Sequence, residues 1–190
     1  IAKSLPIEFK LVVKEHPVMK TLGWRKISYY RELLELPNVI IVHPSMTPES
    51  LYKKCSLVIT TTGTAGFEAA FYKKPTIVLA DVIYSEIGSI HRLKSMEELP
   101  ATIKTALDTK VESEDLINFI KKIEQNSFRF DTNQLATNFS SKYYYGGFQT
   151  DEEISIEKIE QFLKDHEDDL TKSSMEHIKK INLINTSNKL

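Results

Sequence analysis

Four short runs of almost uninterrupted apolar residues restrict the folds open to this chain of 190 residues. They lie at residues 9–14, 39–42, 56–60 and 76–80. An apolar side chain at nearly every position, rather than at alternate ones, is typical of strands covered on both faces. The four runs are therefore predicted to be strands of a parallel sheet.

Helical patterns separate these runs, at residues 27–36, 48–54 and 65–72, and Pro48 suits a first helical position. Strands that alternate with helices predict a doubly wound, Rossmann-like α/β domain. After residue 94 apolar positions recur at helical spacing, which predicts a helical carboxy-terminal region. We expect a first domain at residues 1–107, a helical extension at residues 108–170 that packs on it or on another domain, and a frayed or weakly docked tail at residues 171–190.

Composition narrows the function classes. The net charge of −1 gives no overall electrostatic footprint for nucleic acid. Residues 1–60 nevertheless carry nine Lys or Arg against five Glu, so an anionic ligand is expected in this basic part. One cysteine, Cys55, excludes an intramolecular disulfide, and no apolar run of about 18 residues predicts a transmembrane segment.

Three threonines and two glycines follow the third predicted strand, in the sequence TTGTAG at residues 61–66. We call this segment the threonine turn. Strand-to-helix turns at the carboxyl edge of a parallel sheet offer N–H groups to anions, and Gly63 and Gly66 permit close backbone approach. The hydroxyls of Thr61, Thr62 and Thr64 add donors that suit a phosphate or diphosphate. The alternative is that one threonine merely caps the helix.

Glu68 lies about one turn into the helix that follows. A carboxylate there is placed to accept hydrogen bonds from the two hydroxyls of a ribose. It equally suits an acid in the first turn that complements the helix dipole. The residues alone leave both interpretations open.

The first predicted strand ends in Lys14-Glu15-His16-Pro17. Pro17 keeps the preceding residue extended, so His16 is expected to project from the strand end toward the threonine turn, where it would donate to a phosphate oxygen or leaving group. Lys14 is assigned to the same candidate phosphate site. His43-Pro44 ends the second strand in the same way and is a weaker candidate.

Metal binding, nucleophilic catalysis by cysteine and aromatic stacking of a ligand are less well supported by the sequence. The five histidines are scattered and no Asp-x-Asp occurs, so no metal site is predicted. Cys55 lies at a helix-to-strand junction away from the candidate edge, which disfavours a nucleophilic role. The aromatic run from Phe139 through Tyr143 to Phe148 is expected to be hinge packing more often than a stacking surface for a base or sugar.

The stretches KLVVKEHP, LPNVIIVHP and SLVITTTGTAGFEAAFYKKPTIVLADVIY resemble the capsule polysaccharide biosynthesis proteins, relatives of bacterial Kdo and sialic-acid transferases. The resemblance covers roughly residues 1–107. It implies half of a GT-B architecture of two facing Rossmann-like domains, with this chain as the carboxy-terminal, donor-binding half. It further implies that His16 and the threonines hold the donor phosphate, that Glu68 binds ribose, and that residues 73–75 form a structural turn.

The resemblance implies a metal-independent glycosyltransferase without a cofactor, whose substrate is a nucleotide-activated sugar. A CMP-linked donor is favoured, and UDP-linked and CDP-glycerol-type donors remain open. A polysaccharide or glycolipid is the expected acceptor. The general base is expected in an amino-terminal domain upstream of Ile1, without which the chain should bind but not turn over. We expect a cytoplasmic protein, with peripheral association at the inner face of the membrane also open.

Two alternatives stay open at this point. A UDP-GlcNAc 2-epimerase shares the architecture and the ribose glutamate, and it would need acid/base carboxylates near the sugar. A non-catalytic binding or assembly module would use the helical region after residue 94 to dock a partner. Titration with CMP and UDP separates this last class from the two enzymes.

Overall fold

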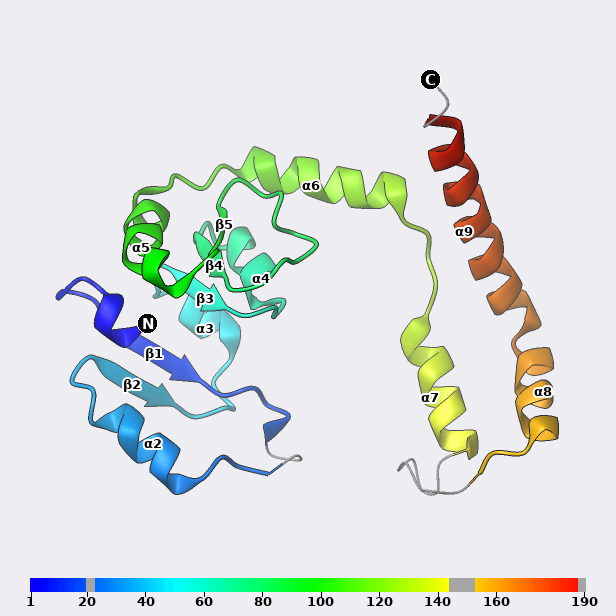
Figure 1. Cartoon of the computed structure of the whole chain (residues 1–190), viewed down its shortest axis with the longest axis horizontal. Coiled ribbons are helices and arrows are strands. Elements are labelled where there is room, and N and C mark those ends of the chain that lie inside the picture. The colour runs from blue at the N-terminus through cyan, green and yellow to red at the C-terminus, as the bar shows by residue number, and fades with distance from the viewer. Residues whose placement is uncertain (20–22, 144–152, 188–190) are drawn as a thin grey trace. The chain divides into compact units, whose positions relative to one another are not determined.

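The computed structural model describes residues 1–19, 23–143 and 153–187. They fall into two compact units, Ile1–Ile123 and Glu124–Leu190. In the described chain the first unit holds the strands, whereas the second is helical (Figure 1). The predicted domain boundaries at residues 107 and 170 stay a prediction, because a compact unit of the structure need not coincide with a domain.

The first unit follows the predicted alternation of strands and helices. Its elements are η1 (Ala2–Ser4), β1 (Leu11–Lys14), α2 (Ile27–Leu34), β2 (Val39–Val42), α3 (Pro48–Tyr52), β3 (Val58–Thr60), α4 (Ala65–Phe71), β4 (Thr76–Val78), β5 (Ile90–Arg92), η2 (Met96–Glu98), α5 (Leu99–Asp108) and the start of α6 (Ser113–Asn126). The four predicted strands all occur. The strand β5 was not predicted, because His91 and Arg92 interrupt its apolar run.

All described strand pairs are parallel, which confirms the α/β class. The strands form two sheets, one of β1 and β2 and one in the order β3-β4-β5. The sequence predicts one sheet in which the carboxyl ends of β1 and β3 lie at the same edge. Among the described residues β1 pairs only with β2, and β3 pairs with β4, so the segments after β1 and after β3 follow strands of different sheets.

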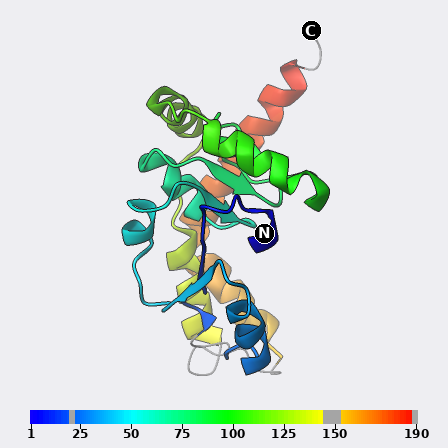
Figure 2. The ribbon, with the colours of Figure 1, turned by 90° about the vertical axis from the view of Figure 1, so that its left-hand side faces the viewer.

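The three-stranded sheet is covered on both faces, as its apolar composition predicts. Neighbouring residues of β4 point to opposite faces, and both are fully buried: Ile77 packs with Leu99 and Ile103 of α5, whereas Val78 packs in a cluster with Phe119 of α6. Figure 2 shows α5 beside this sheet. The first part of α6 therefore completes the core of the first unit.

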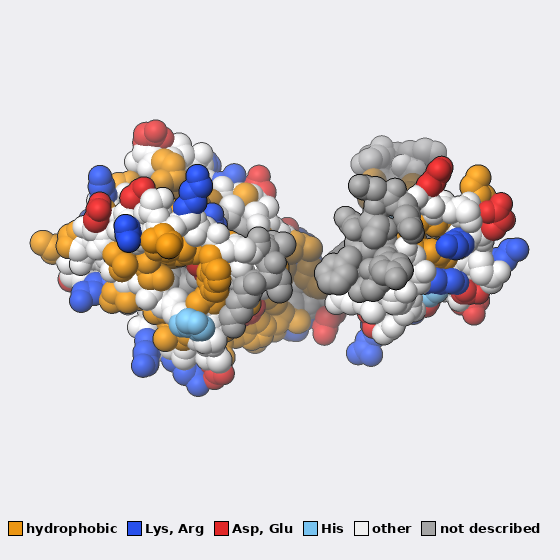
Figure 3. All heavy atoms as spheres, turned by 90° about the horizontal axis from the view of Figure 1, so that it is seen from below, with side chains coloured by type: hydrophobic (Ala, Val, Ile, Leu, Met, Phe, Trp, Pro, Cys, Tyr) orange, Lys and Arg blue, Asp and Glu red, His pale blue; other side chains and the backbone are white. Residues whose placement is uncertain are grey.

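The two-stranded sheet is less covered. Val12 and Ile40 are paired across β1 and β2, and their side chains are 45% and 42% exposed. Hydrophobic side chains are also visible on the face of the first unit that Figure 3 presents. The prediction of strands buried on both faces thus holds fully for β4, whose residues are all buried, whereas the residues of β3 are half-buried and β1–β2 are partly exposed.

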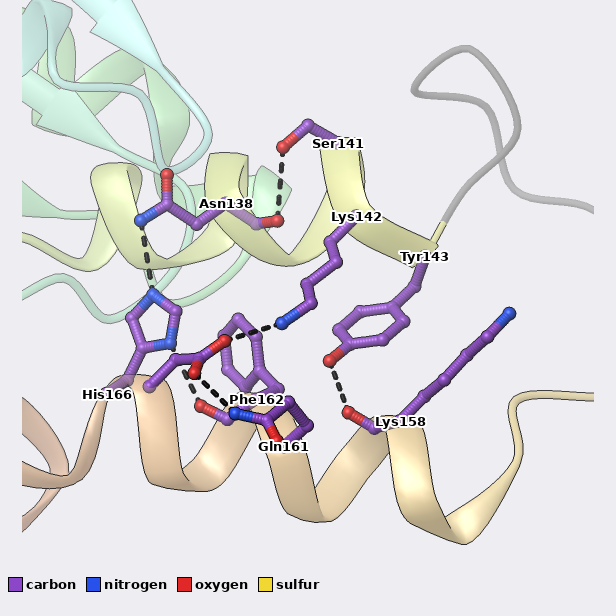
Figure 4. A network of polar contacts seen from close by, with 9 residues as sticks. Asn138, Ser141, Lys142, Tyr143, Lys158, Gln161, Phe162 and His166 are labelled. Atoms are coloured by element: carbon purple, nitrogen blue, oxygen red, sulfur yellow. Dashed lines mark hydrogen bonds and ion pairs between the residues drawn. The ribbon is translucent and has the colours of Figure 1, made fainter.

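In the second unit α7 (Thr132–Tyr143) packs on α8 (Ile156–Asp165) through aromatic rings. Phe162 contacts the ring of Tyr143 and stacks on His166 at 4.1 Å between centroids (Figure 4). It also contacts the ring of Phe139 edge-on. Lys142 pairs with Asp165 at 2.6 Å across the same helices. The described members of the aromatic run thus serve helix packing, and the rest of the run, residues 144–148, lies outside the described residues.

The helix α9 (Glu167–Ser187) contains the described part of the segment predicted to be a frayed or weakly docked tail. Acidic residues in its first turn complement the helix dipole. Lys180 Nζ donates to Asn126 Oδ1 at 2.8 Å, and His177 contacts the ring of Phe128 edge-on. Within residues 1–19, 23–143 and 153–187, no helix has both the length and the apolar character to cross a membrane.

His91 makes the stability of the first unit sensitive to acid. Its ring lies 3.0 Å from Thr109 Oγ1, and burial lowers its pKa. The unfolded chain therefore binds the proton more tightly than the folded protein, so stability is intact above about pH 6.5 and falls as the pH drops below it. We expect His91→Gln to unfold in urea with a weaker pH dependence between about pH 7 and about pH 5. Exposed His43, changed to Gln, is the control, and an unaltered slope in His91→Gln would contradict the prediction.

Candidate functional site

The threonine turn connects β3 to α4 and leaves its side chains in solvent. Thr61, Thr62 and Thr64 are all exposed. Among the described residues, the hydroxyls of Thr61 and Thr62 make no hydrogen bond to the protein. Thr64 occupies the N-cap position of α4 without a side-chain capping bond. The structure therefore lacks the capping role that was the alternative interpretation of these threonines.

Tyr84 connects the threonine turn to the hydrophobic core. Its hydroxyl donates to the carbonyl oxygen of Gly63, while its ring lies in the hydrophobic core with Val78 and Phe119. The side chain is 5% exposed, and burial raises the pKa of its phenol. Sequence reasoning missed Tyr84, because a turn residue and a tyrosine 21 positions later carry no shared local signal.

The two glycines of the turn have different surroundings. A Cβ at Gly66 would lie 2.9 Å from Tyr84 Oη and 3.0 Å from Thr76 Cγ2, so the close approach here is between α4 and the protein core. Gly63 is exposed, and its N–H donates to Thr60 Oγ1 at 3.2 Å. The structure gives Gly66 a packing role, and approach of a ligand to either glycine stays a prediction.

Glu68 is the best-organised polar side chain of the candidate site. Its Oε1 accepts a hydrogen bond from Thr64 Oγ1 at 2.9 Å, and its Oε2 accepts one from Tyr52 Oη at 3.1 Å. Tyr52 is 5% exposed, and burial together with the Glu68 carboxylate raises the pKa of its phenol. Sequence reasoning identified Glu68 and Thr64 but missed Tyr52, which lies on another helix.

A surface depression of about 670 Å³ lies between α3 and α4, and we call it the α3–α4 hollow. Its lining includes two carboxylates and three aromatic rings: Thr47, Pro48, Glu49, Tyr52, Glu68, Phe71 and Tyr72. Glu49 pairs with Lys53 at 2.6 Å, which leaves the carboxylate of Glu68 as the ordered acceptor of the hollow. Carboxylates beside aromatic rings are suited to hydroxyl-bearing ligands with apolar ring faces.

His16 follows β1 and is exposed. Its Nδ1 accepts a hydrogen bond from the Val18 N–H at 3.1 Å, so the neutral ring carries its proton on Nε2. That N–H is a donor suited to a phosphate oxygen. His43 after β2 is arranged similarly: its Nδ1 accepts from the Ser45 N–H at 3.2 Å, and it also lies 2.6 Å from Ser45 Oγ.

A buried carboxylate fixes the segment before His16. Glu15 is 9% exposed, and its Oε1 accepts from Arg25 Nε at 2.9 Å and from Tyr30 Oη at 3.3 Å. Lys14 Nζ donates to the Glu15 carbonyl oxygen at 3.4 Å, beside the strand end. Neither Arg25 nor Tyr30 was predicted, because their relation to Glu15 depends on tertiary structure.

The structure brings together only part of the predicted site. Thr64 and Glu68 are in direct contact. Over the described chain, no hydrogen bond or ion pair joins His16 to the threonine turn. Their convergence on one ligand therefore stays a prediction.

Cys55 is not favoured as a nucleophile. Burial raises the pKa of its thiol, which lowers the fraction of nucleophilic thiolate at neutral pH.

The family model described as capsule polysaccharide biosynthesis protein matches residues 1–123, well over half of the chain. The chain belongs to this family. The match ends where the first compact unit ends, at Ile123. All residues predicted for the site lie within it: Lys14, His16, Thr61, Thr62, Gly63, Thr64, Gly66 and Glu68.

Membership of the capsule polysaccharide biosynthesis family supports a role in capsule synthesis. Neither the curated proteins nor the solved structures contain a match to the chain. In the part of the chain that the structure describes, no group of three or more His, Cys, Asp or Glu side chains is arranged to hold a metal ion.

Proposed function

We propose that this chain is the donor-binding half of a nucleotide-sugar-dependent glycosyltransferase that acts in capsule or surface polysaccharide synthesis. One observation carries the proposal: exposed hydroxyl donors at Thr61 and Thr62 lie on the loop that leads into α4, and Glu68 in the first turns of α4 has both carboxylate oxygens held by hydroxyls. Donors for a phosphate and an acceptor for sugar hydroxyls thus occur on one short segment. A nucleotide sugar contains both partners.

The chemistry follows from the charge that develops in glycosyl transfer. An acceptor hydroxyl attacks the anomeric carbon of the donor while the bond from that carbon to the phosphate oxygen breaks, and the electron pair goes to the phosphate. The hydroxyls of Thr61 and Thr62 and the Nε2–H of His16 would stabilise that negative charge. The proton of the acceptor hydroxyl goes to a general base, which we place in an amino-terminal domain of the enzyme.

The same donor and acceptor groups indicate which classes of sugar donor and acceptor the enzyme would use. We propose CMP-linked sugars as the favoured donors and UDP-linked sugars as the alternative, with a polysaccharide or glycolipid as acceptor. Glu68 would accept from the ribose hydroxyls, and Lys14 would add positive charge near the phosphate. The mechanism invokes neither a metal ion nor a cofactor.

Titration of the chain with CMP and with UDP tests the proposal, since each supplies a ribose and phosphate without the sugar. Saturable binding by calorimetry is expected for at least one of them. We expect His16→Ala to weaken binding about tenfold, because a hydrogen bond to a charged oxygen contributes roughly 1.5–3 kcal/mol.

His43→Ala is the matched control for His16→Ala, because His43 also precedes a proline at a strand end and also accepts through Nδ1. As the weaker candidate, it should lose clearly less affinity for the nucleotide than His16→Ala does. Equal loss in both variants would contradict the specific role of His16. Binding of neither nucleotide would favour a non-catalytic assembly module.

A further inference from the structure

We propose that Tyr52 and Thr64 are positioning residues that orient the Glu68 carboxylate toward a pair of neighbouring hydroxyls, and that the α3–α4 hollow thereby selects ribonucleotides over deoxyribonucleotides. The inference rests on the proposed function, because it assumes that a nucleotide is the ligand. It assigns Thr64 to the sugar side of the site and leaves the phosphate to Thr61 and Thr62.

The contacts show how the carboxylate is fixed. Thr64 Oγ1 donates to one oxygen of Glu68 at 2.9 Å from the preceding turn, and Tyr52 Oη donates to the other at 3.1 Å from α3. Tyr52 is itself held by burial and by the ring of Tyr72, whose centroid lies 5.4 Å away. The carboxylate is therefore bound at both oxygens, by the N-cap residue of its own helix and by the last residue of α3.

The number of lone pairs decides what else the carboxylate can bind. An ionised carboxylate offers about four acceptor sites, two on each oxygen. The hydroxyls of Thr64 and Tyr52 occupy one site on each oxygen of Glu68. One further site remains on each oxygen, which matches the two O–H donors of a vicinal diol such as the 2′- and 3′-hydroxyls of ribose.

The negative charge of the α3–α4 hollow also favours the ribose of a nucleotide over its phosphate. Glu49 and Glu68 both line it, and Lys53 is paired with Glu49. A phosphoryl group placed here would meet the Glu68 carboxylate with like charge. The uncharged, hydroxyl-rich part of a nucleotide is suited to the hollow, and the phosphoryl group to the exposed hydroxyls of Thr61 and Thr62.

The experiment compares the affinities of CMP and 2′-deoxy-CMP for the same chain, with the UDP pair used in parallel. We expect the unaltered chain to bind the ribonucleotide about tenfold more tightly, because the deoxy compound leaves one Glu68 acceptor site unfilled. Tyr52→Phe and Thr64→Val should each reduce this ratio about threefold or more, whereas Thr64→Ser, which keeps the hydroxyl, should preserve it. The ratio reports on the diol, so a general loss of stability would not change it.

Tyr30→Phe is the matched control, because it also removes a tyrosine hydroxyl that donates to a glutamate, Glu15, and it lies outside the hollow. Its ratio should equal that of the unaltered chain. A ratio unchanged in Tyr52→Phe and Thr64→Val would overturn the inference, as would an equal loss of both nucleotides in Thr64→Val, which would place Thr64 on the phosphate. Absence of binding by the unaltered chain would instead overturn the proposed function, and the inference with it.

Discussion

Replacement of Gly66 by valine is expected to lower the free energy of unfolding of the first unit by about 3 kcal/mol. A Cβ at this position would lie 2.9 Å from Tyr84 Oη and 3.0 Å from both Tyr84 Cε2 and Thr76 Cγ2. Thr76 is fully buried and Tyr84 is 5% exposed, so neither can move aside without disturbing the core. The displaced Tyr84 would also lose its hydrogen bond to the carbonyl of Gly63.

Urea unfolding monitored by circular dichroism measures this loss. Gly63→Ala is the control, because Gly63 is exposed and its Cβ would meet only the hydroxyl of Thr60 closely, at 2.9 Å. We expect that variant to lose less than about 1 kcal/mol. Two variants of equal stability would show that the contacts of Gly66 with Tyr84 and Thr76 do not constrain the fold.

The double variant Thr61→Val with Thr62→Val is expected to bind CMP about a hundredfold more weakly than the unaltered chain. Each substitution keeps the shape of the side chain and removes a hydroxyl that, under the proposed function, donates to a charged phosphate oxygen. Such a bond contributes roughly 1.5–3 kcal/mol, so two of them account for a factor of this size. Because both side chains are exposed, the melting temperature should change little.

Calorimetric titration of the double variant with CMP gives the affinity. Thr105→Val removes a threonine hydroxyl from an exposed position of α5 and is the control. It should bind CMP normally. Normal affinity in the double variant would remove the threonine turn from the phosphate site, even if CMP binds elsewhere on the chain.

Most elements of the first unit were predictable from local pattern. Runs of apolar residues located β1 to β4, and Pro48 marked the start of α3. The covering of β4 on both faces also followed, since Ile77 and Val78 are apolar neighbours in a strand. These features depend on the chemistry of a few consecutive residues, which a sequence displays directly.

The division of the strands into two sheets was not predictable in this way. Which strand lies beside β1 depends on tertiary packing, and all parallel strands have similar apolar sequences. Tyr52 and Tyr84 escaped prediction for the same reason. Each reaches the candidate site from another part of the chain, 16 residues from Glu68 and 21 residues from Gly63 respectively. Glu68 and the threonines were identified because they adjoin the turn itself.

Tyr84 has a practical consequence, because one side chain belongs both to the hydrophobic core and to the threonine turn. A ligand held by the turn requires the folded core, so it will bind the native state and not the unfolded chain. Such a ligand raises the melting temperature, and at a concentration one hundred times its dissociation constant it adds about 2.7 kcal/mol of stability. Thermal-shift screening of nucleotides and sugar nucleotides is therefore a direct route to the natural substrate.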